Sequence, residues 1–247
     1  MKSPKRIADE IEYCYREFGS RFLWLTDDNF GLGGVTNELC EEITHRGIAD
    51  DVMWFMQVRC DDIVEHGDLL PKVRKAGNHW MLVGLESHSP EVLNAFNKSI
   101  NPAQAKQAMN LLKKNDIFAQ ATFVIGERRD SHESIGRLRE FVNDVDPDLA
   151  IFMVLTPFPG TDLHEDAQRN GWIEDTNWAH YDMVHAVMPT ENLSREEVQG
   201  ELYDSYRSFY GSMKRRFKGL FSPNTLKRRT YRYLASQGLL KALGDLV

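Results

Sequence analysis

Residues 80–87 read WMLVGLES, an apolar run of the length of one β-strand that ends in Glu86 and Ser87. Four more apolar runs end in polar residues in the same way, at residues 22–25, 52–58, 118–125 and 149–155. The runs recur roughly every 30 residues, about the length of one strand–helix unit. Ligands of parallel α/β folds bind at the carboxyl ends of the strands. The five polar strand ends therefore predict one shared binding site.

The segments between the runs carry helix signals. Three pairs place a capping residue directly before a proline, as at the first turn of a helix: Ser3-Pro4, Ser89-Pro90 and Asn101-Pro102. The apolar runs are rich in Val, Ile, Phe, Trp and Met and mostly lack alternation with polar residues, which is typical of strands buried on both faces. Together these patterns predict an α/β fold with a parallel sheet, either open or curled into a partial barrel.

The composition is that of a soluble globular protein. Of the 247 residues, 42% are hydrophobic and 27% are charged. No apolar run approaches the ~18 residues of a membrane-spanning helix. Cys14, Cys40 and Cys60 lie 26 and 20 residues apart, which is neither a disulfide framework nor a metal-binding spacing. We therefore expect a reducing, cytoplasmic location.

The C-terminal end of the chain differs in charge from the rest. Residues 1–211 carry 21 Lys and Arg against 36 Asp and Glu, whereas residues 212–247 carry 9 against one. Most of these basic residues lie between Lys214 and Arg232. Such a stretch could contact a membrane surface, an acidic partner or the acidic body of the protein. The pattern favours a solvated helical tail over these contacts.

Two strand ends in the N-terminal part carry groups that suit a small polar ligand. Asp27, Asp28 and Asn29 follow the first run and could bind an ammonium group or a divalent cation, although such residues are equally common in turns. Arg59 ends the second run and suits a carboxylate or a phosphate. The alternative for Arg59 is an ion pair with Asp61 or with the aspartate that follows it.

The strand end at Glu86 is the strongest candidate. A carboxylate there can accept hydrogen bonds from two hydroxyl groups of a ribose, and Gly84 lets the backbone approach closely. The alternative is that Glu86 caps the helix that begins at Pro90.

The last two strand ends are candidates for contacts with a flat ring. Gly126 and Glu127 follow the fourth run, where a glycine can leave backbone groups free to contact an adenine edge. Thr156 and Pro157 begin a turn that two prolines hold rigid, which suits the wall of a pocket. The alternative for this turn is a plain strand-to-helix connection. The sequence contains no zinc signature and no phosphate-binding loop.

Taken together, these motifs resemble the radical S-adenosylmethionine enzymes. Within them, the nearer match is the group that carries an N-terminal cobalamin-binding domain and includes the anaerobic magnesium-protoporphyrin IX monomethyl ester cyclases. The resemblance runs through residues 3–4, 9–12, 27–30, 59, 84–87, 123–126 and 155–161. With residues 178–210 included, it covers most of the chain.

The resemblance implies a fold and a set of cofactors. The fold is an incomplete (βα)6-type partial TIM barrel over residues 1–172, lacking its first strand, followed by a loop-rich and helical extension over residues 173–247. The cofactors are S-adenosylmethionine, a 4Fe–4S cluster and cobalamin. In the family, the cluster cleaves S-adenosylmethionine reductively to a 5′-deoxyadenosyl radical, which abstracts hydrogen from the substrate. We expect either oxidative cyclisation of a tetrapyrrole or C-methylation with cobalamin.

The resemblance also implies roles for single residues. Asp27, Asp28 and Asn29 match positions that contact the amino group of S-adenosylmethionine, and Arg59 is the candidate for its carboxylate.

The remaining positions match those that hold the nucleoside. Glu86 and Ser87 correspond to the ribose site. The positions near adenine, which act largely through the backbone, are Gly126, Glu127, Thr156 and Pro157. The resemblance assigns no catalytic residue and no metal ligand in this chain.

The chain departs from the family pattern at three places. The cluster motif CxxxCxxC would precede the first helix, and the three cysteines of this chain cannot replace it, because a cluster needs closely spaced thiolates. After Gly126 the sequence reads ERRDS, where relatives often have Pro and Glu-Thr. The basic tail is the third departure. We therefore expect the chain to be the distal part of a radical enzyme, truncated before the cluster motif and the cobalamin domain. It would act on a small-molecule substrate and would need the missing N-terminal segment or a partner chain. We expect no binding to nucleic acid.

Two other functions fit the residues. A non-catalytic binding module would retain an adenosyl pocket without an iron–sulfur cluster. A hydrolase would use Asp27, Asp28 and Glu86 to hold a metal ion in a complete small barrel, although such sites usually need histidine or more carboxylates.

Overall fold

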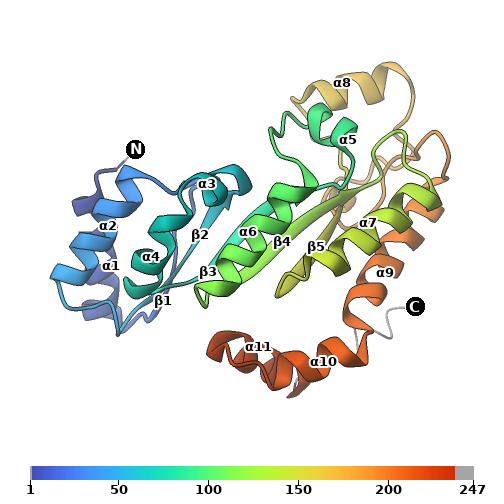
Figure 1. The fold of residues 1–247 in the computed structure, drawn as a ribbon. Helices are drawn as coiled ribbons and strands as arrows, with labels where there is room; N and C mark the ends of the chain where they lie inside the picture. Colours follow the sequence, from blue (N-terminus) through green and yellow to red (C-terminus); the bar gives the residue numbers. More distant parts are fainter. Residues whose placement is uncertain (1, 237–247) are drawn as a thin grey trace. The chain divides into compact units, whose positions relative to one another are not determined.

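The computed structural model describes residues 2–236, apart from the side chains of Lys214, Arg216 and Leu234. Strands and helices alternate along the chain as the sequence predicts (Figure 1). The strands are β1 (Phe22–Trp24), β2 (Met53–Arg59), β3 (Asn78–Glu86), β4 (Phe118–Ile125) and β5 (Leu149–Val154). Each strand coincides with one of the five apolar runs to within two residues at either end.

The strands form one sheet in the order β1-β2-β3-β4-β5. β1 pairs with β2, and β2 with β3, in parallel, so that Trp24 lies opposite Phe55 and Phe55 opposite Trp80. A strand order that follows the sequence is that of a partial strand–helix barrel, whereas the order reverses in a doubly wound sheet. The predicted fold class is confirmed.

The chain divides into two compact units. Unit 1 comprises residues 1–85, 97–121 and 147–149, and unit 2 comprises residues 86–96, 122–146 and 150–247. The helices of unit 1 are α1 (Pro4–Phe18), α2 (Gly34–His45), α3 (Cys60–Glu65), α4 (Leu70–Lys75) and α6 (Pro102–Lys114), with the 3-10 turn η1 (Gly67–Leu69). Those of unit 2 are α5 (Pro90–Ala95), α7 (His132–Val145), α8 (Asp162–Arg169), α9 (Arg195–Tyr210), α10 (Met213–Leu220) and α11 (Thr225–Ser236), with η2 (Trp178–His180). The predicted boundary at residue 172 stays a prediction.

The helix starts agree with the capping signals in the sequence. The side chains of Ser3, Ser89 and Asn101 accept hydrogen bonds from backbone N–H groups in the first turns of α1, α5 and α6. α3 is a helix that the sequence analysis missed, because it follows β2 without a loop or a capping side chain.

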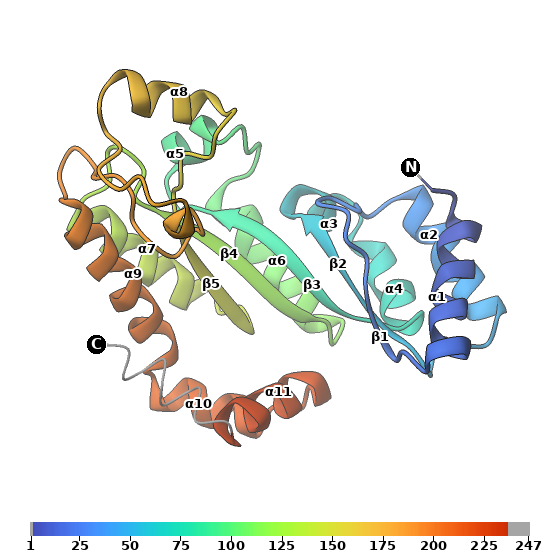
Figure 2. The same ribbon diagram turned by 180° about the vertical axis from the view of Figure 1, so that it is seen from behind.

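The core of unit 1 lies between its strands and its helices. Figure 2 shows α1, α2 and α4 on one side of β1 and β2. Trp54, Met56 and Val58, at alternate positions of β2, are buried. The indole N–H of Trp54 donates to the carbonyl oxygen of Ala76 at 2.8 Å, which satisfies its one polar group. The apolar composition of these strands therefore reflects burial under helices.

Unit 2 closes the far edge of the sheet with side chains. The hydroxyl of Tyr210 on α9 donates to the carbonyl oxygen of Ala150 at 2.8 Å and accepts from its N–H at 3.1 Å. One helical turn earlier, the hydroxyl of Tyr206 makes the same pair of bonds to Phe152, at 3.0 and 3.2 Å. Two tyrosines thus take the place of a neighbouring strand beside β5, where an open edge would invite pairing with another chain.

No helix among residues 2–236 combines the length and the apolar character needed to span a membrane.

Candidate cofactor site

The positions that the sequence singles out fall into two groups. Asp27, Asp28, Asn29 and Arg59 belong to unit 1, and the positions from Glu86 onwards belong to unit 2. Within each unit they stand at or just beyond the carboxyl ends of strands. That all of them share one site stays a prediction.

Glu86 is the last residue of β3, and its backbone has a left-handed φ of 60°. A residue with a side chain in this region carries strain of about 1–3 kcal/mol, and such strain is common at functional sites. The hydroxyl of Thr122, a buried residue of β4, donates to the Glu86 carboxylate at 3.4 Å. Ser89 is the residue that caps α5, since its Oγ accepts from the N–H of Val92. The interpretation of Glu86 as a helix cap is therefore wrong.

A cleft of about 470 Å³ opens beside Ser87 within unit 2. The residues that line it include His88, Arg129 and Arg137. Burial, together with the charge of Arg137, lowers the pKa of His88 and keeps the ring neutral near pH 7. Nδ1 of His88 is buried and has no hydrogen-bond partner among the described residues. A cleft of this size suits a small ligand, and the unpartnered nitrogen fits one with polar groups.

The turn after β4 is organised by a buried carboxylate. The N–H groups of Gly126 and Glu127 both donate to Oδ2 of Asp130, at 2.9 and 3.1 Å, and burial raises the pKa of Asp130. Gly126 has a φ of 82°, and a Cβ there would come within 3.1 Å of Val198. The positive φ favours glycine here, and a Cβ would also force the Val198 side chain to shift slightly. Because both N–H groups are occupied, any contact of this turn with an adenine edge runs through carbonyl oxygens.

The turn after β5 is stabilised by hydrogen bonds, and its predicted rigidity stays a prediction. Thr156 and Pro157 are buried. The Thr156 hydroxyl donates to the carbonyl oxygen of Val154 at 3.0 Å, and the carbonyl oxygen of Pro157 lies 2.9 Å from Nδ1 of the buried His164. Thr161 then caps α8. These bonds connect the turn to β5 and to α8.

The acidic positions of unit 1 lie on the connection between β1 and α2. Asp27, Asp28 and Asn29 are exposed, and Asp28 and Asn29 form a turn, as one of the two interpretations expects. Asp27 also lines a cleft of about 580 Å³ that includes Lys2 and Glu10 of the N-terminal segment. None of the three side chains makes an ion pair or a hydrogen bond within residues 2–236, so their oxygens are open to a ligand.

Arg59 is the last residue of β2. Its guanidinium donates two hydrogen bonds to Asp61, from Nε at 2.9 Å and from Nη2 at 2.5 Å. The hydrogen bond from Arg59 lowers the pKa of Asp61. The expected alternative, an ion pair with a neighbouring aspartate, is confirmed. A ligand carboxylate would have to displace Asp61 from at least one side of the guanidinium fork.

The cysteines do not fit an iron–sulfur cluster. Cys40 and Cys60 are buried, and burial raises the pKa of each thiol to about 12, whereas a cluster needs thiolates. In the described part of the chain, no group of three or more His, Cys, Asp or Glu could hold a metal ion. The donor set therefore gives no support to a metal-dependent hydrolase at Asp27, Asp28 and Glu86.

Sequence reasoning missed several residues of the unit 2 site. Asp130 orders the turn after Gly126, Thr122 orients Glu86, and His88 lines the cleft. His88 could have been found from the sequence, because it directly follows Ser87 at a predicted strand end. Thr122 could not have been found in this way, because it lies inside the fourth apolar run. Only the register between β3 and β4 brings it next to Glu86.

The comparisons with known proteins agree with this fold. Residues 1–142 match the family model described as the radical SAM superfamily.

The chain belongs to the radical SAM superfamily.

Two curated relatives show the range of this similarity. The chain is 32% identical over 211 residues to the anaerobic magnesium-protoporphyrin IX monomethyl ester cyclase of Cereibacter sphaeroides, covering 85% of this chain and 34% of that protein. It is 25% identical over 235 residues to the bacteriochlorophyllide d C-8(2)-methyltransferase of Chlorobaculum tepidum, covering 92% of this chain and 51% of the relative. The chain thus spans between about a third and a half of these relatives.

Among solved structures, the fold is similar to that of the cobalamin-dependent S-adenosylmethionine radical enzyme OxsB, with a TM-score of 0.66. The match covers 99% of this chain and 42% of OxsB at 13% identity, and at that identity it shows the fold alone. Members of the radical SAM family use S-adenosylmethionine and a 4Fe–4S cluster, and the relatives of this chain include cyclases and methyltransferases. The family resemblance drawn from the sequence is confirmed.

Proposed function

We propose that this chain forms the part of a radical SAM enzyme that holds the adenosyl group of S-adenosylmethionine. The complete enzyme would either cyclise a tetrapyrrole oxidatively or methylate carbon with cobalamin. The observation that carries the proposal is Glu86, a carboxylate held with left-handed backbone geometry at a strand end of a radical SAM fold. When bound in a complete enzyme, S-adenosylmethionine supplies a 5′-deoxyadenosyl radical, and the residues of this chain bind and orient it.

In this proposal the ribose binds at the end of β3. The Glu86 carboxylate accepts hydrogen bonds from two ribose hydroxyls, and Thr122 fixes its orientation through the bond at 3.4 Å. Ser87 adds a hydroxyl group, and the unpartnered Nδ1 of His88 supports a polar ligand in the adjoining cleft. Charge-assisted hydrogen bonds of this kind are stronger than neutral ones, so Glu86 would contribute most to ribose binding.

The adenine and methionine parts of the ligand are assigned to the other strand ends. Carbonyl groups of Gly126 and Glu127, and the turn at Thr156 and Pro157, would contact adenine. The exposed oxygens of Asp27, Asp28 and Asn29 suit the amino group, and Arg59 suits the carboxylate once it shares or leaves Asp61.

The other cofactors would come from outside this chain. The cysteines do not fit a cluster, so we propose that a segment outside these 247 residues or a partner chain carries the 4Fe–4S ligands and the cobalamin domain. The two curated relatives described above, of which this chain spans about a third to a half, are named for tetrapyrrole substrates, which supports a tetrapyrrole as the small-molecule substrate. The division into a partial barrel over residues 1–172 and an extension over residues 173–247, and a cytoplasmic location, belong to the same proposal.

Titration calorimetry with S-adenosylhomocysteine, which carries the adenosyl group, tests the ribose site. We expect Glu86→Gln to weaken binding by about 10-fold to 100-fold, because a hydrogen bond to a charged group contributes about 1.5–3 kcal/mol. Glu65→Gln is the matched control, since Glu65 is an exposed glutamate on α3 with no assigned role. Equal affinities of Glu86→Gln and the unchanged chain, or no binding by the unchanged chain, would contradict the proposal.

A non-catalytic binding module is the second candidate. Among the described residues, no group of three or more His, Cys, Asp or Glu could hold a metal ion. This favours the binding module for this chain taken by itself. Anaerobic reconstitution with iron and sulfide separates the two. A stable, stoichiometric iron–sulfur absorbance in the isolated chain would exclude the binding module, whereas a chain that binds the adenosyl ligand but never iron would support it.

A further inference from the structure

The helix α10 carries its apolar side chains on the side that faces solvent. Met213, Phe217 and Phe221 are 59%, 56% and 72% exposed. Met213 and Phe217 lie four residues apart on one face of the helix, and Phe221 directly follows its last residue. Arg215 lies two residues after Met213, and Gly219 lies two residues after Phe217. Two residues correspond to about 200° around a helix, so Arg215 and Gly219 lie on the opposite face. This polarity is the reverse of what a surface helix of a soluble protein shows.

The inner face of α10 is held by specific contacts within unit 2. The guanidinium of Arg215 bonds to Asp146 at 2.6 Å and lies 3.7 Å from the centre of the Phe209 ring. Gly219 allows α11 to approach so closely that a Cβ there would overlap the ring of Tyr231. Because Arg215 and Gly219 fix the orientation of α10, the apolar face cannot turn inward without breaking these contacts.

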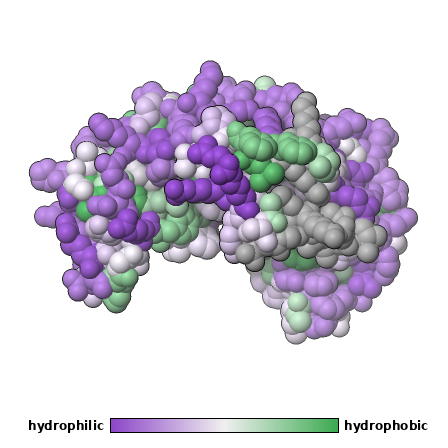
Figure 3. Space-filling view, turned by 90° about the horizontal axis from the view of Figure 1, so that it is seen from below, coloured by the Kyte–Doolittle hydropathy of each residue, from purple (hydrophilic) through white to green (hydrophobic). Residues whose placement is uncertain are grey.

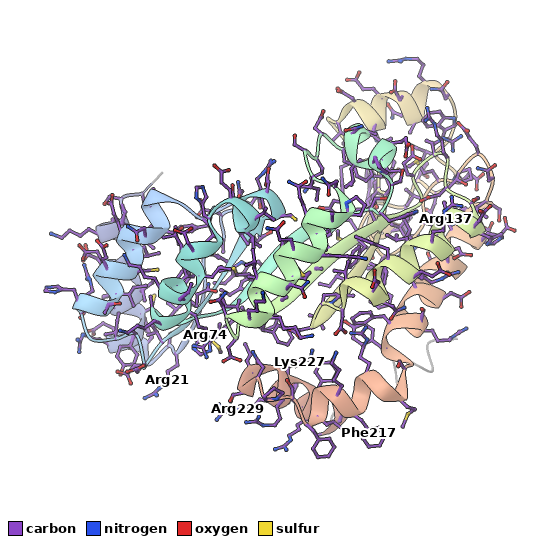
Figure 4. All side chains as sticks on the ribbon, in the orientation of Figure 1. Arg21, Arg74, Arg137, Phe217, Lys227 and Arg229 are labelled. Atoms are coloured by element: carbon purple, nitrogen blue, oxygen red, sulfur yellow. The ribbon has the colours of Figure 1, made fainter. Side chains whose placement is uncertain are left out.

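The neighbouring helix presents positive charge on its exposed side. Arg229 and Arg232 of α11 are exposed and make no ion pair within residues 2–236. Tyr233 beside them is 62% exposed. Figure 4 shows Arg229 and Phe217 along the lower rim of the α10–α11 pair and Lys227 along its upper rim. In the view from below, a hydrophobic patch lies directly beside strongly hydrophilic residues over these two helices (Figure 3).

An anionic lipid surface can bind both the apolar side chains of α10 and the arginines of α11. Acyl chains would take up the apolar side chains, while headgroup phosphates would pair with the arginines. A second copy that docks through the same two helices fits less well, because residues 212–236 contain no Asp or Glu that could pair with Arg229 and Arg232. The sequence favoured a solvated tail here, but solvation does not account for three large exposed apolar side chains. Lys214 and Arg216, also part of the basic stretch, have side chains outside the described set.

We propose that the α10–α11 pair docks this protein onto anionic lipid membranes. Met213, Phe217 and Phe221 would enter the boundary between headgroups and acyl chains, and Arg229 and Arg232 would bind lipid phosphates. Docking is peripheral, in the plane of the interface. It is independent of the adenosyl site, so failure of one proposal leaves the other standing.

Co-sedimentation of the full chain with vesicles tests the proposal. We expect binding to phosphatidylglycerol–phosphatidylcholine vesicles that is at least tenfold tighter than binding to phosphatidylcholine alone and that weakens with added salt. The double variant Phe217→Ser, Phe221→Ser should lose at least tenfold in affinity for both kinds of vesicle. Arg229→Gln with Arg232→Gln should lose about 25-fold for the anionic vesicles only, at about fivefold for each arginine.

The control removes two charges elsewhere. Lys75→Gln with Lys114→Gln takes away two exposed lysines of unit 1 and should bind as the unchanged chain does. An equal loss in this control would overturn the proposal, since binding would then follow net charge alone. It would also be overturned by absence of binding, by binding that appears only after residues 237–247 are removed, or by a dimer that Phe217→Ser with Phe221→Ser dissociates in the absence of lipid.

Discussion

The two tyrosines beside β5 allow a quantitative test of how unit 2 protects the sheet edge. In Tyr210→Phe the ring stays and only the hydroxyl is lost, together with the bonds at 2.8 and 3.1 Å to the backbone of Ala150. Tyr210 is 3% exposed, so water cannot easily replace the hydroxyl. Burial also raises the pKa of Tyr210, which keeps the hydroxyl protonated as a donor.

The expected loss of stability in Tyr210→Phe follows from the backbone N–H and C=O of Ala150, which lose their hydrogen-bond partner. Two hydrogen bonds contribute about 0.5–1.5 kcal/mol each, and a buried N–H or C=O left without a partner costs about 1–3 kcal/mol, with some relief from the more apolar ring. We expect Tyr210→Phe to lower the free energy of unfolding by about 2–4 kcal/mol. Tyr206→Phe removes a similar pair of bonds to Phe152, but Tyr206 is only partly buried. Since water can replace its hydroxyl, the loss should be about 0.5–1.5 kcal/mol.

Urea unfolding of the chain, followed by circular dichroism, measures both losses from the shift of the midpoint at constant slope. Hydrogen exchange at the Ala150 amide should speed up in Tyr210→Phe and change little in Tyr206→Phe. Tyr203→Phe on the same helix is the control, because Tyr203 is 38% exposed and makes no hydrogen bond to β5. The reasoning is refuted if Tyr210→Phe loses less than about 1 kcal/mol, or if Tyr206→Phe loses as much as Tyr210→Phe.

Three further predictions concern single groups. In the folded chain Cys14 should react with Ellman's reagent well before Cys40 and Cys60, because burial raises the pKa of both thiols to about 12; equal rates for all three would contradict this. Burial alone would raise the pKa of Asp146, but hydrogen bonding and charge from two basic neighbours on α10 hold it below its ordinary value. Its contribution to stability is therefore present above the unfolded pKa of about 3.9 and lost as pH falls through the lower folded pKa. Urea midpoints measured across pH should show a smaller acid-induced drop for Asp146→Asn than for the unchanged chain, and identical drops would argue against the linkage. Glu86→Gly should raise the free energy of unfolding by up to about 1 kcal/mol, since glycine adopts this φ without strain, while calorimetry shows loss of adenosyl binding; a clear loss of stability would mean that the backbone is not strained there.

Several parts of the fold could be predicted because their signals are local. The five strands follow from apolar runs, and the starts of α1, α5 and α6 follow from a capping side chain before a proline. The short helix α3 was missed because it has neither signal. Its first residue, Cys60, continues directly from β2.

The candidate site was predictable only in part. The positions of Glu86 and Ser87 at the end of β3 follow from the chain itself, because the end of an apolar run marks the end of a strand. The contacts that orient them do not. Thr122 reaches Glu86 from a strand 36 residues away, and Asp130 occupies the N–H groups of the turn that is expected near adenine, which leaves its carbonyl groups for such a contact.

Four features follow from local periodicity or from the order of short motifs: the strands, the capped helix starts, the parallel α/β class and the family. Four others became apparent only in the folded chain: the strained backbone of Glu86, the pairing of Arg59 with Asp61, the tyrosines along β5 and the exposed apolar side chains of α10. The physical reason is that these features depend on which groups meet across the fold. Burial and hydrogen-bond partners arise from packing between distant segments, and a linear pattern of residue types carries no direct record of it.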